Sequence, residues 1–247
     1  MPTINRRAKL AEETTSPEVL STLADDTSKK VRAAVSRNPH TPVEVLRQLV
    51  VDPVWLVRFD VAENPSRHAL DVARQAADRD VRGAAAQRAD LTHRDIDALV
   101  SDEDKEVRVR MAEASSEVDV LRQLAGDEHP AVRGAVAAND RTPPDVMETL
   151  ATDRIARVRA SAAASRRLSP RSRDRLVSDR SADVRWSLLV THPDDVNVAE
   201  RLSGDADDVV AGQAAAQAQD PGSFTGYLRD DDPDGLDQGP PDEVDAT

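Results

Sequence analysis

The side chains that recur most regularly in this sequence are charged, and their spacing would bring opposite charges together. An arginine directly follows a valine in seven copies, 24 to 26 residues apart, and six copies also carry an aspartate five residues before the valine. Guanidinium groups bind carboxylates through two parallel hydrogen bonds, so the matched registers favour ion pairs. The arginines are Arg32, Arg58, Arg82, Arg108, Arg133, Arg159 and Arg185. The aspartates are Asp26, Asp52, Asp102, Asp127, Asp153 and Asp179.

A row of arginines with one member in each copy has two interpretations. The row forms either a cationic track for phosphate groups or an acidic peptide, or a structural ladder in which each guanidinium binds an aspartate and backbone carbonyl groups. Because the two residue types recur together, we predict the ladder and assign both a structural role. The third copy lacks the aspartate, and in the eighth copy Asp205 is displaced by one residue.

A second group of arginines lies mostly outside this register. Residues 154–185 contain ten arginines and only three acidic residues. The simplest interpretation is solvated surface charge. The alternative is a patch that binds phosphate groups, an acidic peptide or the acidic tail of the same chain. No aromatic residue interleaves with the candidate partner-binding arginines for stacking on bases, which weakens the case for single-stranded nucleic acid. These arginines are Arg166, Arg167, Arg171, Arg173 and Arg175.

The only two tryptophans, Trp55 and Trp186, are further candidates for contact with a partner. Trp55 lies two residues before its repeat valine and Trp186 lies two residues after, so the two occupy different positions in their units. Each tryptophan either fills a gap beside alanine-rich neighbours or anchors a partner at an exposed surface.

Side chains for catalysis or metal binding show no matching pattern. The chain has no cysteine, which excludes disulfides, thiolate zinc sites and cysteine nucleophiles. The five histidines fall mostly in predicted turns and out of common register, so we predict no metal site. No phosphate loop, dinucleotide glycine motif or serine-nucleophile elbow is present. We therefore predict a protein that is not an enzyme and requires no cofactor.

The C-terminal segment 220–247 has a different composition from the rest. It contains nine acidic residues and one basic residue, with many prolines and glycines, and we expect it to be disordered. Phe224, Tyr227 and Leu228 lie inside it and are predicted to anchor the tail over the apolar end of the last repeat. The alternatives are a linear motif for a partner and a tail that folds back over the Arg166–Arg175 patch.

The overall composition predicts a soluble protein with a thin core of small side chains. Hydrophobic residues make up 39% and aromatic residues only 2%, so alanine, valine and leucine must supply the core. The net charge of −13 does not exclude nucleic acid, because most of it lies in the tail. The N-terminus lacks the apolar run of a signal peptide, and no segment approaches the ~18 apolar residues of a membrane span. We expect a cytoplasmic protein.

The charged residues belong to a repeat that fills most of the chain. A leucine lies three residues before the repeat aspartate. We predict that each copy of the repeat forms two short helices. A hydroxyl residue followed by proline is predicted to cap the first helix. Such pairs are Ser16-Pro17, Thr41-Pro42, Thr142-Pro143 and Ser169-Pro170, and capping-box spacing occurs in Thr41 with Glu44 and Thr92 with Asp95.

The second helix of each copy contains the repeat valine. The repeat aspartate is predicted to cap this helix, most plainly at Asp52-Pro53. Asn38-Pro39 and Asn64-Pro65 are predicted to end it, because a residue before proline avoids the helical conformation.

Stacked copies of this unit predict an all-α fold, an α-solenoid of about eight two-helix repeats. One helix pair cannot bury its apolar face alone, whereas stacked pairs share a continuous core. We place the solenoid at residues 16–219, an N-terminal lead-in at 1–15 and the acidic tail at 220–247. The last unit has Val210 in place of the arginine and Gln213 at a core position, as expected of a terminal capping unit.

The segments TPVEVLRQLVVDP (residues 41–53) and VRFDVAENP (57–65) resemble the leucine-rich repeat variant family. The resemblance implies units that pair an α-helix with a 3₁₀-helix. The Asp-x-x-x-x-Val-Arg element is also similar to HEAT repeats, in which aspartate and arginine form a ladder between neighbouring units. Some members of the variant family carry a cysteine-rich iron–sulfur segment, a feature that does not transfer to this chain.

Such repeats are used mainly as binding surfaces. The leading prediction is therefore a non-catalytic scaffold for protein–protein interaction, with an unidentified protein partner. The alternative is nucleic-acid binding through residues 154–185, modulated by the acidic tail.

Overall fold

The computed structural model describes residues 2–220, and all regular secondary structure there is α-helical, which confirms the predicted fold class. The chain divides into two compact units, Met1–Leu168 and Ser169–Thr247. The helices of unit 1 are α1 Ile4–Glu13, α2 Pro17–Ala24, α3 Lys29–Arg37, α4 Val43–Leu49, α5 Trp55–Ala62, α6 Arg67–Ala73, α7 Arg79–Ala86, α8 His93–Val100, α9 Lys105–Ala114, α10 Val118–Leu124, α11 Pro130–Ala138, α12 Pro144–Leu150 and α13 Ala156–Ala163. The helices of unit 2 are α14 Pro170–Leu176, α15 Ala182–Thr191, α16 Val196–Leu202 and α17 Asp208–Gln219.

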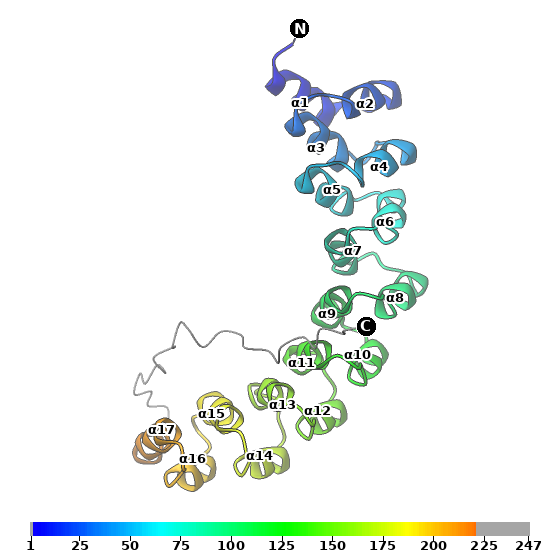
Figure 1. Cartoon of the computed structure of the whole chain (residues 1–247). Coiled ribbons are helices and arrows are strands. Elements are labelled where there is room, and N and C mark those ends of the chain that lie inside the picture. Colours follow the sequence, from blue (N-terminus) through cyan, green and yellow to red (C-terminus); the bar gives the residue numbers. More distant parts are fainter. Residues whose placement is uncertain (1, 221–247) are drawn as a thin grey trace, which may run out of the picture. The chain divides into compact units, whose positions relative to one another are not determined.

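Within unit 1 the helices form two rows, with the odd-numbered helices in one and the even-numbered helices in the other (Figure 1). Neighbouring odd-numbered helices pack against each other more closely than neighbouring even-numbered helices do. Gly83 of α7 illustrates this closeness, since a methyl group added to it would lie 3.4 Å from the side chain of Arg110 in α9. The row of odd-numbered helices therefore forms the tightly packed side of the unit.

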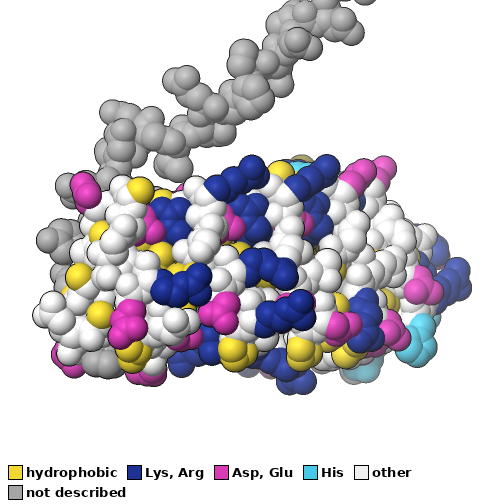
Figure 2. All heavy atoms as spheres, turned by 90° about the horizontal axis from the view of Figure 1, so that it is seen from below, with side chains coloured by type: hydrophobic (Ala, Val, Ile, Leu, Met, Phe, Trp, Pro, Cys, Tyr) yellow, Lys and Arg dark blue, Asp and Glu magenta, His cyan; other side chains and the backbone are white. Residues whose placement is uncertain are grey.

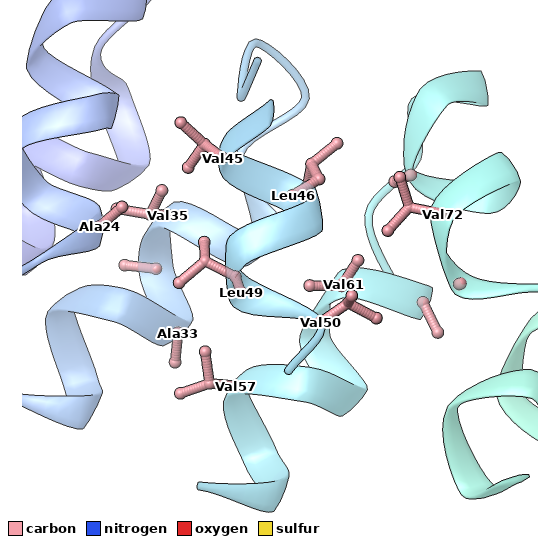
Figure 3. Packing of buried hydrophobic residues seen from close by; sticks show 14 of the residues in the cluster. Ala24, Ala33, Val35, Val45, Leu46, Leu49, Val50, Val57, Val61 and Val72 are labelled. Atoms are coloured by element: carbon pink, nitrogen blue, oxygen red, sulfur yellow. The ribbon is translucent and has the colours of Figure 1, made fainter. Parts of the chain in front are cut away.

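The core of unit 1 lies between the two rows and consists of small aliphatic side chains. Figure 3 shows Leu46 and Leu49 of α4 beside Val57 and Val61 of α5, with Val35 reaching in from α3. All five side chains are buried. Each layer of this core is shared by consecutive helix pairs, so the stack buries apolar surface that a single pair would leave exposed.

Several predicted helix caps are confirmed. The Ser16 hydroxyl accepts a hydrogen bond from the Val19 N–H at 3.3 Å, and the Ser169 hydroxyl accepts one from the Ser172 N–H at 3.1 Å. The Thr92 capping box with Asp95 is also present. These hydroxyl and carboxylate groups satisfy N–H groups that the first helical turn leaves without partners.

Other predicted caps are wrong by one or two residues. Helix α4 begins at Val43, and the Thr41 hydroxyl instead donates to the Val35 carbonyl at 2.6 Å, which ties the turn to the preceding helix. Thr41 and Glu44 therefore form no capping box. Helix α5 begins at Trp55, so Asp52 lies before the cap position; its carboxylate accepts the Val54 N–H at 2.8 Å and closes the preceding turn.

The repeating unit differs from the one implied by the family resemblance. Both helices of each pair are α-helices in residues 2–220, without a 3₁₀ partner. In addition, α1 packs against α3 and buries Ala8 and Ala11, so the N-terminal segment supplies a helix to the odd-numbered row.

Unit 2 contains two helix pairs, and its last helix corrects the predicted register. In α17 the buried residue is Val210 rather than Val209, and Gln213 and Ala214 are buried with it. With Val210 as the repeat valine, Asp205 lies five residues before it, as in the other copies. The displacement inferred from the sequence therefore arose from aligning the wrong one of two adjacent valines.

No helix in the described part of the chain is long and apolar enough to cross a membrane.

Candidate partner-binding surface

The repeated arginines and aspartates form ion pairs between successive units. Arg32 of α3 binds Asp52 at 2.6 Å through Nε and at 3.1 Å through Nη2, and its Nη1 donates to the Asp26 carbonyl at 2.8 Å. Each guanidinium thus joins the turn of its own two-helix repeat to the turn of the next repeat. Equivalent rungs are Arg82–Asp102 at 2.7 Å, Arg108–Asp127 at 2.7 Å, Arg133–Asp153 at 2.6 Å and, in unit 2, Arg185–Asp205 at 2.5 Å.

Each rung aspartate also fixes its own turn by accepting the backbone N–H two residues further on. For Asp52, burial alone would raise the pKa of the carboxyl, but hydrogen bonds from Arg32 and from the Val54 N–H lower it. For Asp26, the hydrogen bond from Arg7 has the largest effect and lowers the pKa. These carboxylates are therefore held in their charged form, as a structural ion pair requires.

The structure contains two rungs that the sequence analysis missed. Arg7 of α1 binds Asp26 at 2.5 Å, which adds a rung before the first complete unit. In the third copy, whose aspartate position holds Ala76, Arg58 binds Asp78 at 2.7 Å instead. Asp78 is also the N-cap of α7, so this residue combines two roles.

The ladder arginines are not available as a cationic track in unit 1. The Arg133 side chain is only 8% exposed, and its donors are occupied by Asp153 and by the carbonyl groups of Asp127 and Glu128. Arg159 donates to the Asp153 carbonyl at 2.8 Å, and Asp179 in unit 2 accepts the Ser181 N–H at 2.9 Å. The geometry is that of a structural element rather than of a ligand-binding surface.

A second row of side chains, also missed from sequence, connects the ends of the odd-numbered helices. The Asn38 amide donates to the carbonyl groups of Ala11 and Thr14 at 2.7 and 2.9 Å, and its oxygen accepts the His40 N–H at 2.8 Å. Asn64 and Asn139 repeat this arrangement on their preceding units. We call this set the amide row. Asn38 and Asn64 had been interpreted only as helix ends; the matching position of Asn139, which no proline follows, was the signal for a packing role.

The predicted basic patch is divided between the two units. In unit 1, Arg166 and Arg167 are exposed, and Arg167 donates to the Asp140 carbonyl. In unit 2, Arg173 forms an ion pair with Asp195 at 2.9 Å. Arg166, Arg171 and Arg175 are exposed and have no ion-pair partner among the described residues. Figure 2 shows that on one face basic side chains alternate with acidic and hydrophobic ones.

An aromatic pair lies at the surface of α5. Trp55 is 46% exposed, and its ring stacks on that of Phe59 one turn later, with centroids 4.9 Å apart and an interplanar angle of 26°. Leu56 beside it is 44% exposed. We call Trp55, Leu56 and Phe59 the α5 surface. Trp186 of α15 occupies the repeat position that Phe59 occupies in α5, and it is half-buried.

A groove of about 450 Å³ lies between α4 and α6, close in sequence to the α5 surface. Val51, which is 70% exposed, lines this groove together with Val43, Val50 and Val72. The rest of the lining consists of polar residues and two alanines, namely Arg47, His68, Asp71, Gln75, Ala76 and Ala77. Three large hydrophobic side chains that are exposed, those of Val51, Trp55 and Leu56, thus lie within residues 51–56.

The described residues contain no group of three or more histidine, aspartate or glutamate side chains placed to hold a metal ion. Asp95 is a buried carboxylate, but it binds Arg67 at 2.7 Å, Arg74 at 3.1 Å and the Thr92 hydroxyl at 2.6 Å. Asp95 therefore joins the start of α8 to residues of α6 and the turn after it, which is a structural role. The predicted tail anchor of Phe224, Tyr227 and Leu228 lies outside the described residues.

Comparisons with known proteins agree with the repeat geometry. The family model described as "Leucine rich repeat variant" matches residues 30–54. The solved structure of a leucine-rich repeat variant with a novel repetitive structural motif is similar over 81% of each chain, with a TM-score of 0.59 and 25% sequence identity. A structure of the Escherichia coli protein YibA is 15% identical, with a TM-score of 0.40 over 89% of this chain and 98% of that one. No curated protein matches the sequence. The predicted family resemblance is confirmed.

Proposed function

We propose that this chain, which is similar to the leucine-rich repeat variant family in sequence and in fold, is a non-catalytic scaffold that binds a partner protein through the α5 surface. The observation that carries this proposal is the exposure of Trp55. The chain contains only five aromatic residues, yet one of its two tryptophans is 46% exposed at the surface of an aliphatic stack. Tryptophan is enriched among the residues that dominate binding energy at protein interfaces.

The neighbouring helices define the chemistry of the partner. The residues of α3 that occupy the positions of Trp55 and Leu56 are Lys29 and Lys30, and both are exposed. On the other side, Arg79 of α7 occupies the position of Trp55 and binds Asp104 at 3.5 Å. An apolar surface with basic residues along its α3 edge fits a protein segment that presents an apolar side chain next to acidic residues.

Site-specific crosslinking tests where the partner binds. A photoreactive amino acid at position 56, introduced in the native host, is expected to crosslink to one protein. The matched control places it at position 118, where Val118 is 42% exposed on α10, and there we expect no such product. Replacing Trp55 with serine in the first variant should remove the crosslink. Equal crosslinking at both positions, or persistence of the product without Trp55, would contradict the proposal.

Affinity measurements with the purified partner then test the energetic role of Trp55. A hot-spot residue contributes about 2 kcal/mol or more, which corresponds to a roughly 30-fold weaker complex on truncation. We expect this loss for Trp55→Ala and little change for Val118→Ala, as measured by calorimetry. Comparable effects of the two substitutions would rule out the α5 surface.

Nucleic-acid binding through the basic segment is the second candidate function. It is supported by Arg166, Arg171 and Arg175, which are exposed and have no ion-pair partner among residues 2–220. It is weakened because Arg167 and Arg173 bind groups within the protein. Fluorescence anisotropy with duplex DNA distinguishes the two functions, since phosphate binding must weaken steeply as salt is raised. Binding that also strengthens in a chain ending at residue 219 would favour a basic patch regulated by the tail.

A further inference from the structure

The amide row is interrupted where serine replaces asparagine, and one of these gaps lies between the third and fourth repeats. In three other units an asparagine amide donates to two carbonyl groups of the preceding unit. For Asn64 these are the carbonyls of Ser36 and Asn38, at 2.6 and 2.8 Å. In the third unit Arg88 does the same with the carbonyls of Ala62 and Asn64. In the fourth repeat α9 is one residue longer than α3, and Ser115 follows α9 as Asn38 follows α3. In the sixth repeat the position holds Ser165, whose hydroxyl accepts the Arg167 N–H at 3.3 Å.

Ser115 performs only half of the asparagine's role. Its hydroxyl accepts the Glu117 N–H at 3.1 Å, just as the Asn38 oxygen accepts the His40 N–H. The backbone conformation is the same, with φ −68° and ψ 136° at Ser115 against φ −70° and ψ 124° at Asn38. The missing half is the amide donor, because the serine side chain is too short to reach the preceding unit.

The carbonyl groups left without that donor belong to Ala86 and Arg88, at the end of α7. They occupy the positions of Ser36 and Asn38 in the Asn64 contact, and no side chain of the described residues donates to them. Both residues line a pocket of about 280 Å³ between α7 and α9. The gap in the row is therefore an open site lined with hydrogen-bond acceptors.

The rest of this pocket has an apolar wall, polar side chains that include Gln87 and Ser116, and one acidic side chain. Met111 and Ile96 are buried side chains that line it, and Leu91 is half-buried beside them. Glu117, an exposed carboxylate, lies at the edge. The guanidinium of Arg88 points to the preceding unit and binds Asp90 at 2.7 Å, so its positive charge is neutralised. The volume equals roughly nine water molecules at about 30 Å³ each, more than one bridging water occupies.

We propose that this pocket binds the arginine side chain of a partner protein. A guanidinium carries five N–H donors in a planar fork, enough for the two carbonyl groups and the Glu117 carboxylate together. Its aliphatic stem packs on the apolar wall while the charged head reaches polar groups. The chain itself uses arginine for this purpose at Arg88, whereas an asparagine from outside would require a second backbone inside the pocket.

The site is separate from the α5 surface, so the two proposals can fail independently. The probe for this one is N-acetyl-arginine methylamide, with N-acetyl-norleucine methylamide as the control that lacks donors. Amide NMR spectra of the full chain are recorded during titration. We expect saturable shifts confined to residues 86–91 and 111–117 with the arginine probe, and a dissociation constant on the order of millimolar for a single side chain.

Two variants test the geometry. Ser115→Asn places the missing amide in the gap, so it should abolish the shifts and raise the midpoint of thermal unfolding by a few degrees. Ser101→Asn, at an exposed position at the end of α8, is the matched control and should bind normally. Glu117→Gln leaves the buried structure unchanged and should weaken binding several-fold.

Three results would overturn the proposal: no saturable shifts in these two segments, equal shifts with the norleucine probe, or undiminished binding by a folded Ser115→Asn variant. If Ser115→Asn fails to fold, unchanged affinity in Glu117→Gln has the same meaning.

Discussion

The ion-pair ladder and the amide row both join consecutive repeats. Within unit 1 the ladder is continuous, whereas the residues of the amide row vary from repeat to repeat. Six rungs follow one another through residues 2–168, and where the third copy lacks the usual aspartate, Asp78 takes its place. The amide row, by contrast, changes to Arg88 in one repeat, is interrupted at Ser115 in the next, and is interrupted again at Ser165.

The difference follows from what each ladder leaves behind when a member is lost. A rung that loses its arginine leaves a carboxylate largely removed from water, and an uncompensated charge in such a place is strongly destabilising. A carbonyl group that loses its amide donor is neutral, and water can replace the donor when the site is open. The chain can therefore open a pocket in the amide row at little cost, whereas a gap in the ion-pair ladder would threaten the fold.

Acidification should break this contrast with the largest effect, because it acts on all rungs together. The pKa values of Asp26, Asp52, Asp78, Asp127 and Asp153 are lowered in the folded chain. Their contribution to stability is thus fully present when the pH is above the pKa of an aspartate in the unfolded chain, about 3.9. It is lost as the pH falls through the lower pKa values of the folded chain. Urea unfolding from pH 7 to 3 should show a nearly constant free energy down to about pH 5 and a steep fall below pH 4. A fall confined to pH 7–5 would contradict this assignment to the rung aspartates.

Removal of a single rung residue should have the next largest effect. Arg133→Ala leaves the Asp153 carboxylate without its partner, at a site where the two side chains are 8% and 10% exposed. Because this site retains some contact with solvent, we expect a loss of about 2–3 kcal/mol, toward the lower limit for buried pairs. The control is Arg122→Ala, whose exposed pair with Asp145 at 3.2 Å should contribute below about 1 kcal/mol. Equal losses in the free energy of unfolding for the two variants, measured with urea, would show that a ladder pair contributes no more than an exposed surface pair.

Removal of an amide should have the smallest effect of the three. Asn64→Ala deprives two carbonyl groups of a donor at a fully buried position, and we expect a loss of about 1–2 kcal/mol. Asn197→Ala, an exposed asparagine on α16, is the control and should change stability by less than about 0.5 kcal/mol. A loss for Asn64→Ala as large as that of Arg133→Ala would remove the distinction between the two ladders.

The ion-pair ladder was predictable from sequence because both of its members recur at a constant spacing. The predicted register is wrong at α17, because two adjacent valines allow two alignments and no arginine follows either of them. The aspartate spacing selects Val210 over Val209, so the information was present. The caps predicted at Thr41 and Thr142 are wrong because a hydroxyl before proline can also bind backward: Thr142 donates to the Val136 carbonyl, as Thr41 does to that of Val35.

The exposure of Trp55 and the pocket at Ser115 were beyond prediction for a different reason. Whether a tryptophan is buried depends on what the neighbouring helices place beside it, and the sequence leaves both outcomes open. The pocket arises from a group that is missing, and its meaning becomes visible only beside Asn38 and Asn64 in their three-dimensional positions.

The rung at Asp78 also bears on how such a chain can change its length. From each rung arginine to its aspartate in the next unit the distance along the chain is 19 or 20 residues, even across the short third unit. The two-residue shortening of the third copy lies between an aspartate and the arginine that follows it, a distance of six residues in most repeats and four from Asp78 to Arg82. A duplication or deletion of whole copies that begins and ends between an aspartate and the next arginine would therefore leave every ion pair intact.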